Sequence, residues 1–253
     1  MPKVSVIIQS HNRPQGLRRA LLSLQMQTTQ DFEVVISDDS TCRDDIESVL
    51  AGPAAQGLNI LYRHTPPCGA AESMREAFGR TSGEFIKILH DDDWLTPRSI
   101  ETQREALDKN TDAGVAYGRA VIPFLTHDQL EYAFFDKHAK VPSSEWVKAF
   151  QANGHGPLQS PVTALYRRHE RFRIMWDEFQ NPVLREAARK TGAGTDVSLQ
   201  VDNALSAPYV LFLPITACYL GTDMSSTTQT DPQIGEYYKL WKSEYDTNPP
   251  WRR

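Results

Sequence analysis

The chain has 253 residues, of which 40% are hydrophobic and 23% are charged, and its formal net charge at pH 7 is -5. A chain of this length can bury a hydrophobic core without disulfide or metal staples. The negative net charge disfavours a nucleic-acid backbone as the main partner. The three cysteines, Cys42, Cys68 and Cys218, form no C-x-x-C pair, so neither a disulfide framework nor a zinc site is expected.

The apolar runs are too short to cross a membrane. The first run, Val4 to Ile8, meets a polar turn at once, which is not typical of a signal peptide. The run from Tyr209 to Leu220 contains Pro214 and is shorter than the roughly 20 residues that a spanning helix needs. We therefore expect a cytoplasmic protein without a transmembrane segment, and loose association with a membrane surface stays open.

Strands and helices are predicted to alternate over the first 120 residues. The β-branched run at residues 4–8 is nearly all apolar and predicts a parallel strand covered on both faces. Further strands are expected at residues 32–36, 59–62, 85–89 and 115–117, and helices from Pro14 onward and at residues 44–50, 70–78 and 97–107. This alternation predicts an α/β fold with a doubly wound, mostly parallel sheet and helices on both faces.

The chain after residue 120 is less regular. Aromatic residues gather between Phe124 and Phe150, where a role in the core or in a subunit contact is favoured over stacking on a ligand. A strand is expected at residues 162–166, and a helix at residues 195–205 with Thr195 as its N-cap. We expect a single domain over residues 1–220 with a loop-rich second half, and a polar C-terminal extension over residues 221–253.

Polar clusters follow three of the apolar strands directly. They are Ser10-His11-Asn12-Arg13-Pro14, Ser37-Asp38-Asp39-Ser40 and His90-Asp91-Asp92-Asp93. Ligands of doubly wound sheets bind outside the carboxyl ends of the strands. Three clusters in this position predict a ligand site at that edge of the sheet.

The last cluster predicts a divalent metal. Asp91, Asp92 and Asp93 crowd three carboxylates together, which is costly unless a cation neutralises them. Oxygen ligands suit Mg²⁺ or Mn²⁺, which carboxylates often hold together with substrate phosphates. The alternative is a solvated acidic turn that caps the helix near Pro97, and Asp93 is the residue best suited to that role alone.

The middle cluster points to a nucleoside rather than to phosphate. Asp38 and Asp39 would repel phosphate, but a carboxylate here can accept hydrogen bonds from a base N–H or a ribose hydroxyl. The alternative is an Asx-turn or a helix N-cap. Neither G-x-G-x-x-G nor a P-loop is present in the sequence, so a dinucleotide site and a P-loop NTPase are not supported.

Taken together, these clusters resemble family 2 of the inverting glycosyltransferases with the GT-A fold. The matching segments are VSVIIQSHNRP, DFEVVISDDS, SGEFIKILHDDDWLTP and GTDVSL, and the first two are similar to spore-coat polysaccharide members. The resemblance implies transfer of a sugar from a UDP or dTDP donor to a saccharide or other hydroxyl acceptor, in polysaccharide or glycoconjugate synthesis. It also implies a nucleotide-sugar-binding half over residues 1–120 and an acceptor and catalytic half over residues 121–220.

The resemblance assigns roles to individual donor-site residues. Asp39 matches the carboxylate that recognises the pyrimidine base, in a pocket lined by Ser10, His11 and Asn12. Asp92 is the expected first ligand of Mn²⁺ or Mg²⁺ and Asp91 the second, with Asp91 also facing the donor. His90 stands where the family has an aspartate, so its contact with ribose or metal stays open.

The catalytic base implied by the resemblance is Asp196 in Gly194-Thr195-Asp196-Val197, with Asp177 and Glu178 as rivals. Thr195 replaces the glutamate usual before it. Arg75 either reaches the diphosphate or lies on a solvated helix face. The implied reaction is a single in-line displacement, in which the base deprotonates the acceptor hydroxyl and the metal neutralises the leaving diphosphate.

Two other functions stay open. A nucleotidyltransferase shares the sheet and the acidic metal ligands, but SHNRP lacks the expected glycine-rich loop. A non-catalytic nucleotide-sugar-binding module is kept open by the changes at His90 and Thr195. An enzyme would lose turnover but keep donor binding in Asp196→Asn, whereas a binding module would show no turnover at all.

Overall fold

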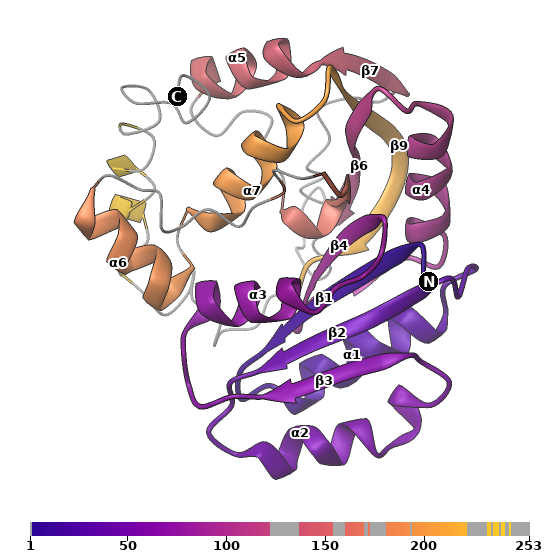
Figure 1. Ribbon diagram of the computed structural model, residues 1–253, viewed down its shortest axis with the longest axis vertical. Coiled ribbons are helices and arrows are strands. Elements are labelled where there is room, and N and C mark those ends of the chain that lie inside the picture. Colours follow the sequence, from indigo (N-terminus) through magenta and orange to yellow (C-terminus); the bar gives the residue numbers. More distant parts are fainter. Residues whose placement is uncertain are drawn as a thin grey trace.

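The computed structural model describes residues 2–121, 137–153, 160–169, 172, 181–192 and 194–221, and a few residues between 232 and 243. Within this part of the chain, nine strands form one mixed sheet in the order β3-β2-β1-β4-β8-β6-β9-β5, and β7 pairs with β9 (Figure 1). The strands are β1 (Val4–Ser10), β2 (Phe32–Asp38), β3 (Ile60–His64), β4 (Phe85–His90), β5 (Trp94–Leu95), β6 (Ala113–Val121), β7 (Ala139–Pro142), β8 (Ala164–Arg167) and β9 (Tyr209–Tyr219).

The helices of the same part of the chain are α1 (Pro14–Gln25), α2 (Arg43–Leu50), α3 (Ala70–Gly79), α4 (Ser99–Lys109), α5 (Ser143–Asn153), α6 (Pro182–Thr191) and α7 (Thr195–Ala204), with 3₁₀ turns at Pro53–Ala55 and Pro161–Thr163. β1 is parallel to both β2 and β4, and β2 is parallel to β3. The predicted α/β architecture with a mostly parallel sheet is therefore confirmed.

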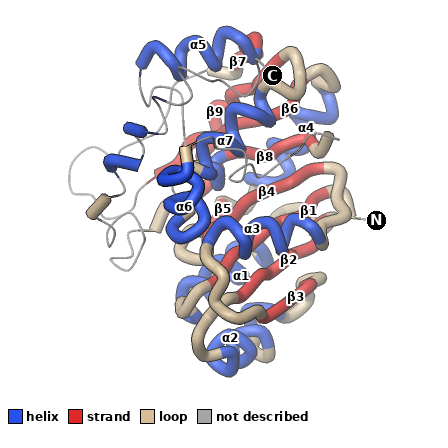
Figure 2. The backbone as a smooth tube through the Cα atoms, turned by 60° about the vertical axis from the view of Figure 1, so that its left-hand side comes forward, coloured by secondary structure: helices blue, strands red, loops and turns tan. Residues whose placement is uncertain are grey.

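The two faces of the sheet are covered by different helices (Figure 2). Val4, Val6 and Ile8 of β1 pack in one buried cluster with apolar side chains of α1, α2 and α4. Ile7 points to the other face and joins a cluster with residues of α3, α5, α6 and α7. Burial on both faces explains why β1 reads as a nearly continuous apolar run. Each fully buried leucine or isoleucine in such a core contributes about 1.5–3 kcal/mol.

The second half of the sheet departs from simple parallel winding. β8 lies between β4 and β6 and is antiparallel to both. β9 is parallel to β6 and antiparallel to β5 and β7. The apolar run at residues 209–220 is thus mostly a strand with neighbours on both sides. Among the described residues, no helix has the length and apolar character to cross a membrane. The three cysteines are free thiols.

Two local predictions were wrong. Thr195 is not the N-cap of α7: this is Gly194, in a left-handed conformation with φ of 80°, and the Thr195 hydroxyl donates to the Gly192 carbonyl at 2.6 Å. Helix α4 begins at Ser99 rather than at Pro97. Of the aromatic residues between 124 and 150, Trp146 is buried and stacks on Tyr117 at a centroid distance of 5.8 Å, as expected for a core residue. Phe124, Tyr132, Phe134 and Phe135 lie outside the described residues.

Candidate functional site

Strands β1, β2 and β4 bring the three polar clusters together at one edge of the sheet. Ser10 is in register with Asp38, and Gln9 with His90, so the parallel strands end side by side. The Asp39 N–H donates to the Ser10 carbonyl at 3.1 Å, which joins the first two clusters through the backbone. The site predicted at the carboxyl edge of the sheet therefore forms one contiguous polar surface.

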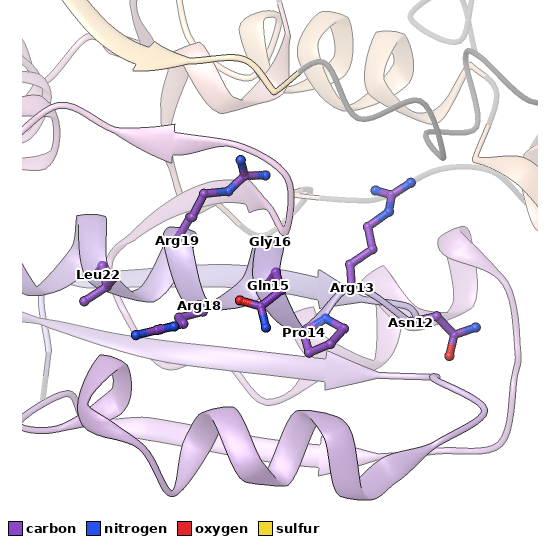
Figure 3. A pocket seen from close by; sticks show the side chains of 8 residues that line it. All are labelled: Asn12, Arg13, Pro14, Gln15, Gly16, Arg18, Arg19 and Leu22. Atoms are coloured by element: carbon purple, nitrogen blue, oxygen red, sulfur yellow. The ribbon is translucent and has the colours of Figure 1, made fainter.

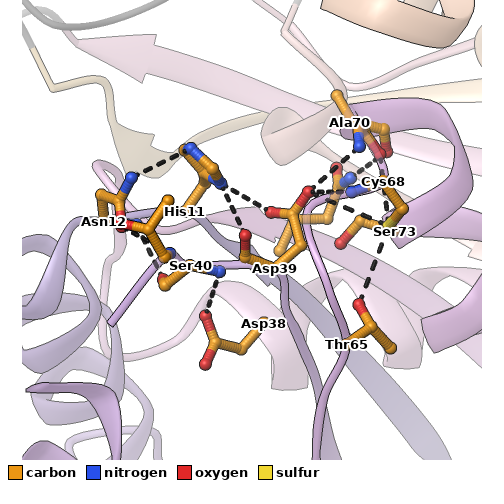
Figure 4. Close-up of polar contacts among 12 residues, drawn as sticks. His11, Asn12, Asp38, Asp39, Ser40, Thr65, Cys68, Ala70 and Ser73 are labelled. Carbon is orange, nitrogen blue, oxygen red and sulfur yellow. Dashed lines mark hydrogen bonds and ion pairs between the residues drawn. The ribbon is translucent and has the colours of Figure 1, made fainter. Parts of the chain in front are cut away.

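Asp39 is the centre of the contacts at the end of β2 (Figure 4). Its Oδ2 accepts hydrogen bonds from the backbone N–H groups of Cys68 and Gly69, both at 3.1 Å. Its Oδ1 lies 2.9 Å from Nδ1 of His11. The carboxylate is buried, with only 7% of its side chain exposed, whereas the His11 side chain is 53% exposed. Asp39 thus ties the turn after β1 to the start of α3.

The His11 tautomer follows from its neighbours. The amide Nδ2 of Asn12 lies 3.0 Å from His11 Nε2, and this amide nitrogen can only donate. We assign the ring proton to Nδ1, from where it reaches both Oδ1 and the carbonyl of Asp39. Asn12 has a φ of 57°, a conformation that asparagine tolerates better than most residues, and its Oδ1 accepts from the backbone and the hydroxyl of Thr41.

Asp38 has a structural role beside this network. Its Oδ1 accepts from the Ser40 N–H at 2.9 Å, which forms the Asx-turn that the sequence offered as an alternative role. Its Oδ2 accepts from the Tyr62 hydroxyl and contacts His64 Nδ1. Burial alone would raise the pKa of Asp38, but the hydrogen bonds from Ser40, His64 and Tyr62 outweigh it and lower this pKa. A buried, fully hydrogen-bonded carboxylate of this kind fixes the backbone that presents Asp39.

The acidic turn, residues 90–93 at the end of β4, is held in place by an arginine. Nη1 of Arg13 lies 3.2 Å from Asp91 Oδ1 and 3.1 Å from Asp92 Oδ2. The other oxygen of Asp91 accepts from the His11 N–H at 3.3 Å. Burial raises the pKa of Asp91 to about 6, and the Arg13 charge opposes that rise. Burial and the charge of Asp93 also raise the pKa of Asp92.

His90, Asp92 and Asp93 form the group of candidate metal ligands among the described residues. One ligand atom from each lies within 4.8 Å of those of the other two, and Asp91 is not in this group. Nδ1 of His90 is 3.4 Å from Asp93 Oδ2, and Asp93 Oδ1 accepts from the Gly221 N–H at 2.8 Å. Burial would lower the pKa of His90, but its hydrogen bond to Asp93 and the charges of the three aspartates raise it to about 9.

Asp93 therefore does not cap α4, the alternative role considered for it. The N-cap of that helix is Arg98, without a side-chain cap. Asp93 instead joins the end of β9 to the acidic turn through Gly221. This contact spans 128 positions of the chain, so no local sequence pattern could predict it.

Two glycines fit closely against the acidic turn. A Cβ on Gly16 of α1 would lie 2.4 Å from the Asp91 carbonyl oxygen, and one on Gly221 would lie 2.1 Å from the Asp92 carbonyl oxygen. Both distances are far below an ordinary contact. The turn is thus packed between α1 and the end of β9, and only residues without a side chain fit at these two positions.

Asp196 lies in the first turn of α7, half-buried, where its Oδ1 accepts from the Val197 N–H at 2.9 Å. The turn before α7 lies against the donor-side half: a Cβ on Gly192 would be 3.2 Å from that of Ala70, the first residue of α3. Ala70 follows directly on Cys68 and Gly69, which bind Asp39. The segment that carries Asp196 therefore borders the same edge of the sheet as Asp39.

An open hollow of about 520 Å³ runs along the start of α1 and shares Asn12 and Arg13 with the polar clusters. Figure 3 shows Arg13 and Arg19 extending to the same side of the helix, whereas Arg18 extends away from them. The Arg19 guanidinium lies 5.4 Å from the centre of the Trp94 ring. The hollow adds positive charge beside an otherwise acidic site.

The remaining predicted residues are less central. The Ser10 side chain is buried, so this residue meets the site through its carbonyl group. Arg75 extends from α3 with 43% of its side chain exposed, and its Nε is 3.9 Å from Glu72. Asp177 and Glu178 lie outside the described residues. No role was predicted for Arg13, Gly16 or Gly221, although a glycine inside the predicted first helix indicates a close backbone approach.

Comparison with known proteins places the chain among glycosyltransferases. Residues 5–173 match the sequence model described as glycosyl transferase family 2. The GalNAc(5)-diNAcBac-PP-undecaprenol beta-1,3-glucosyltransferase of Campylobacter jejuni is 34% identical over 104 residues, which are 40% of this chain and 33% of that protein. An uncharacterized glycosyltransferase of Haemophilus influenzae is 30% identical over 115 residues, or 45% of this chain and 37% of that protein. The chain thus spans about a third of the length of these relatives.

Among solved structures, TarS of S. aureus matches 97% of this chain and 40% of its own length, with a TM-score of 0.68 and 18% sequence identity. A complex of TarS residues 1–349 with UDP-GlcNAc also gives a TM-score of 0.68, over 94% of this chain and 65% of that one. At this identity the likeness establishes the fold, and the predicted GT-A arrangement is confirmed.

Proposed function

Since the chain belongs to glycosyl transferase family 2, we propose that it is a metal-dependent inverting glycosyltransferase that moves a sugar from a nucleoside diphosphate to a hydroxyl acceptor. UDP or dTDP is the proposed donor nucleotide. The observation that carries the proposal is the meeting of His11, Asp39 and the acidic turn at one edge of the sheet. Solved structures of the similar TarS contain UDP-GlcNAc and UDP, which supports a nucleotide-sugar donor.

The proposed base pocket lies around Asp39. Its Oδ2 accepts from two backbone N–H groups, whereas its Oδ1 contacts His11 and, as a carboxylate oxygen, has a second lone pair for a further donor. That lone pair can accept the N3–H of uracil or thymine, a donor that cytosine lacks at this position. The half-exposed His11 ring offers an adjoining surface for the base. A hydrogen bond to a buried carboxylate contributes about 1.5–3 kcal/mol of binding.

The proposed metal position is the acidic turn. Its donor set, two carboxylates and an imidazole within 4.8 Å of one another, fits a divalent cation, and Asp92 is the first ligand with His90 and Asp93 beside it. Asp91, predicted as a second ligand, binds Arg13 and the His11 backbone in this structure, where it shapes the turn. Mn²⁺ or Mg²⁺ bound here would neutralise charge on the diphosphate leaving group.

Asp196 is the proposed catalytic base. Its segment borders the edge that carries Asp39, through the contact between Gly192 and Ala70. From there it takes the proton of the acceptor hydroxyl as that oxygen attacks the anomeric carbon of the donor. In the same proposal, residues 1–120 bind the donor, residues 121–220 shape the acceptor side, and Arg75 approaches the diphosphate. Synthesis of a polysaccharide or glycoconjugate is the setting we propose.

Release of nucleoside diphosphate from UDP- and dTDP-sugars, with Mn²⁺ present, tests this proposal. Asp196→Asn should lower turnover about 10²–10⁴-fold while UDP binding by calorimetry stays within a factor of two to three. Asp177→Asn and Glu178→Gln are the matched controls and should keep most of the activity. If one of these controls loses turnover and Asp196→Asn does not, the residue changed in that control is the catalytic base instead. UDP binding without turnover in any chain would favour a non-catalytic nucleotide-sugar-binding module.

A further inference from the structure

The proposed metal site differs in one donor atom from an all-carboxylate site. His90 occupies the end of β4, in register with Gln9 of β1, and its side chain is 39% exposed. Its Nδ1 lies 3.4 Å from Asp93 Oδ2, and an oxygen of Asp92 completes the group of three ligand atoms. An imidazole nitrogen is therefore placed among the oxygens that would hold the cation.

We propose that His90 is a ligand that makes this site select first-row transition ions such as Mn²⁺ over Mg²⁺. The inference rests on the proposed function, because it concerns the metal of that same site. It assigns to this chain a metal preference set by the residue at position 90.

The chemistry of the donors supports this preference. Mg²⁺ is a hard cation that favours oxygen ligands in near-ideal octahedral geometry and gives up its waters reluctantly. Imidazole nitrogen is a softer donor than a carboxylate oxygen, and first-row transition ions, among which Mn²⁺ is the hardest, accept it more readily than Mg²⁺ does. A histidine in place of a carboxylate also removes one negative charge, which weakens attraction for Mg²⁺ without supplying the oxygen that it prefers.

The surrounding charges agree with a single divalent ion. Arg13 bridges Asp91 and Asp92, so one positive charge offsets part of the three carboxylates. With a neutral imidazole the cluster then carries a net charge of about -2, which one divalent cation balances.

The positions of the ligands are fixed from outside the cluster. Asp93 is held by the Gly221 N–H at 2.8 Å, and Asp92 by Arg13 at 3.1 Å. The close approach of Gly16 and Gly221 to the carbonyl groups of the turn restricts its backbone. A site with such restrained ligands discriminates between ions by donor type, because it cannot rearrange to bring in other oxygens.

Titration of the purified chain with Mn²⁺, followed by electron paramagnetic resonance, tests the inference, with and without saturating UDP. Mg²⁺ competition in the same samples gives the ratio of the two dissociation constants. His90→Asp should lower the preference for Mn²⁺ over Mg²⁺ by about tenfold or more. His138→Asp, the same change at the exposed residue before β7, should leave the ratio unchanged. Spin-echo modulation from a coordinated ¹⁴N should appear with the wild-type chain and disappear in His90→Asp.

The ¹⁴N modulation is measured on the wild-type chain, so this part of the test does not depend on correct folding of His90→Asp. Bound Mn²⁺ without ¹⁴N modulation, an unchanged ratio in His90→Asp, or no Mn²⁺ binding with UDP present would each overturn the inference. Calorimetry of UDP on the same samples reports the proposed function separately. UDP binding with Mn²⁺ but without a nitrogen ligand would overturn only the role of His90, whereas no UDP binding under any condition would overturn the proposed function as well.

Discussion

Gly16→Ala perturbs the backbone of the acidic turn from the side of α1 and changes no charged group. Gly16 is the third residue of α1 and is buried against the Asp91 carbonyl oxygen, which a Cβ would approach to 2.4 Å. The same Cβ would lie 3.2 Å from the Asp91 carbonyl carbon and 3.6 Å from Asp92 Cα. An ordinary contact begins near 3.4 Å, so α1 and the turn must separate by about 1 Å.

The expected change in stability follows from two opposing effects. Overpacking in a well-packed interior costs about 1–3 kcal/mol. Alanine gains at most about 1 kcal/mol over glycine within a helix. The free energy of unfolding should therefore fall by about 1 kcal/mol, equivalent to a thermal midpoint lower by about 2–4 °C for a chain of this size. The larger effect should be on Mn²⁺ and UDP binding, because a shift of about 1 Å at the ligands is large compared with coordination distances.

Two other glycines separate the two effects. Gly83→Ala would place a Cβ 2.6 Å from the Ser5 backbone nitrogen, in the segment before β4 and away from the acidic turn, so it should lose stability but keep metal binding. Gly79→Ala at the end of α3 meets nothing within 4 Å and should have near wild-type stability and binding. Urea denaturation and calorimetry on the three variants give both quantities. Wild-type Mn²⁺ and UDP binding in Gly16→Ala, or equal loss in Gly83→Ala, would refute the reasoning.

Three further substitutions test other parts of the account. Asp39→Asn should raise the dissociation constant for UDP about tenfold or more, because an amide cannot keep both backbone donors and the base N–H, and unchanged UDP binding in calorimetry would contradict this. Lys87 is fully buried with its Nζ 2.8 Å from Gln103 Oε1, and burial lowers its pKa from 10.5 to about 7. Between about pH 7 and 10.5 the unfolded chain holds a proton that the folded chain lacks, so stability should rise with pH in that window, and Lys87→Met should remove this slope. Parallel pH profiles of urea unfolding for the two chains would count against a buried neutral lysine. The pKa of Asp38 is lowered on folding, so its contribution is present above its ordinary range near 3.8 and is lost as pH falls below it. Asp38→Asn should therefore destabilise the chain by about 1–3 kcal/mol at pH 7 and by less near pH 3, and an equal loss at both pH values would argue against this assignment.

The parts of the fold that depend on local pattern were predictable from sequence. The β-branched run at residues 4–8 became β1, because a parallel strand buried on both faces needs apolar side chains in both directions. The helix after Pro14 became α1, since proline suits the first helical turn. The polar clusters lay at one edge because parallel strands end together.

The parts that depend on distant contacts were not predictable. The insertion of the antiparallel β8 between β4 and β6 is a tertiary choice with no local signal. From sequence, the run at residues 209–220 could be judged only too short for a membrane span. Its pairing with β5, β6 and β7 was not predictable, because these strands lie elsewhere in the sequence. Thr195 is a common N-cap type, but Gly194, in a left-handed conformation that glycine adopts readily, occupies that position.

The residue types of the site were predictable from sequence, but most of the contacts between these residues were not. The meeting of His11 and Asp39 followed from strand order. The role of Arg13 as the cation beside Asp91 and Asp92 was missed, because nothing local distinguishes it from a solvated arginine at a helix start. The closure of the acidic turn by Gly221 joins it to the end of β9, and only the folded chain shows this contact.

Calorimetric binding of UDP, dTDP, GDP and ADP, each with Mn²⁺ and with EDTA, tests the central claim most directly. The account predicts that one pyrimidine nucleotide binds with Mn²⁺ and much more weakly with EDTA, and that Asp92→Ala abolishes the metal-dependent part. Asp112→Ala, a change at an exposed aspartate paired with Lys140, is the control and should bind as the wild type does. If none of the four nucleotides binds with or without metal, or if Asp92→Ala binds with full metal dependence, the account of the donor site is contradicted.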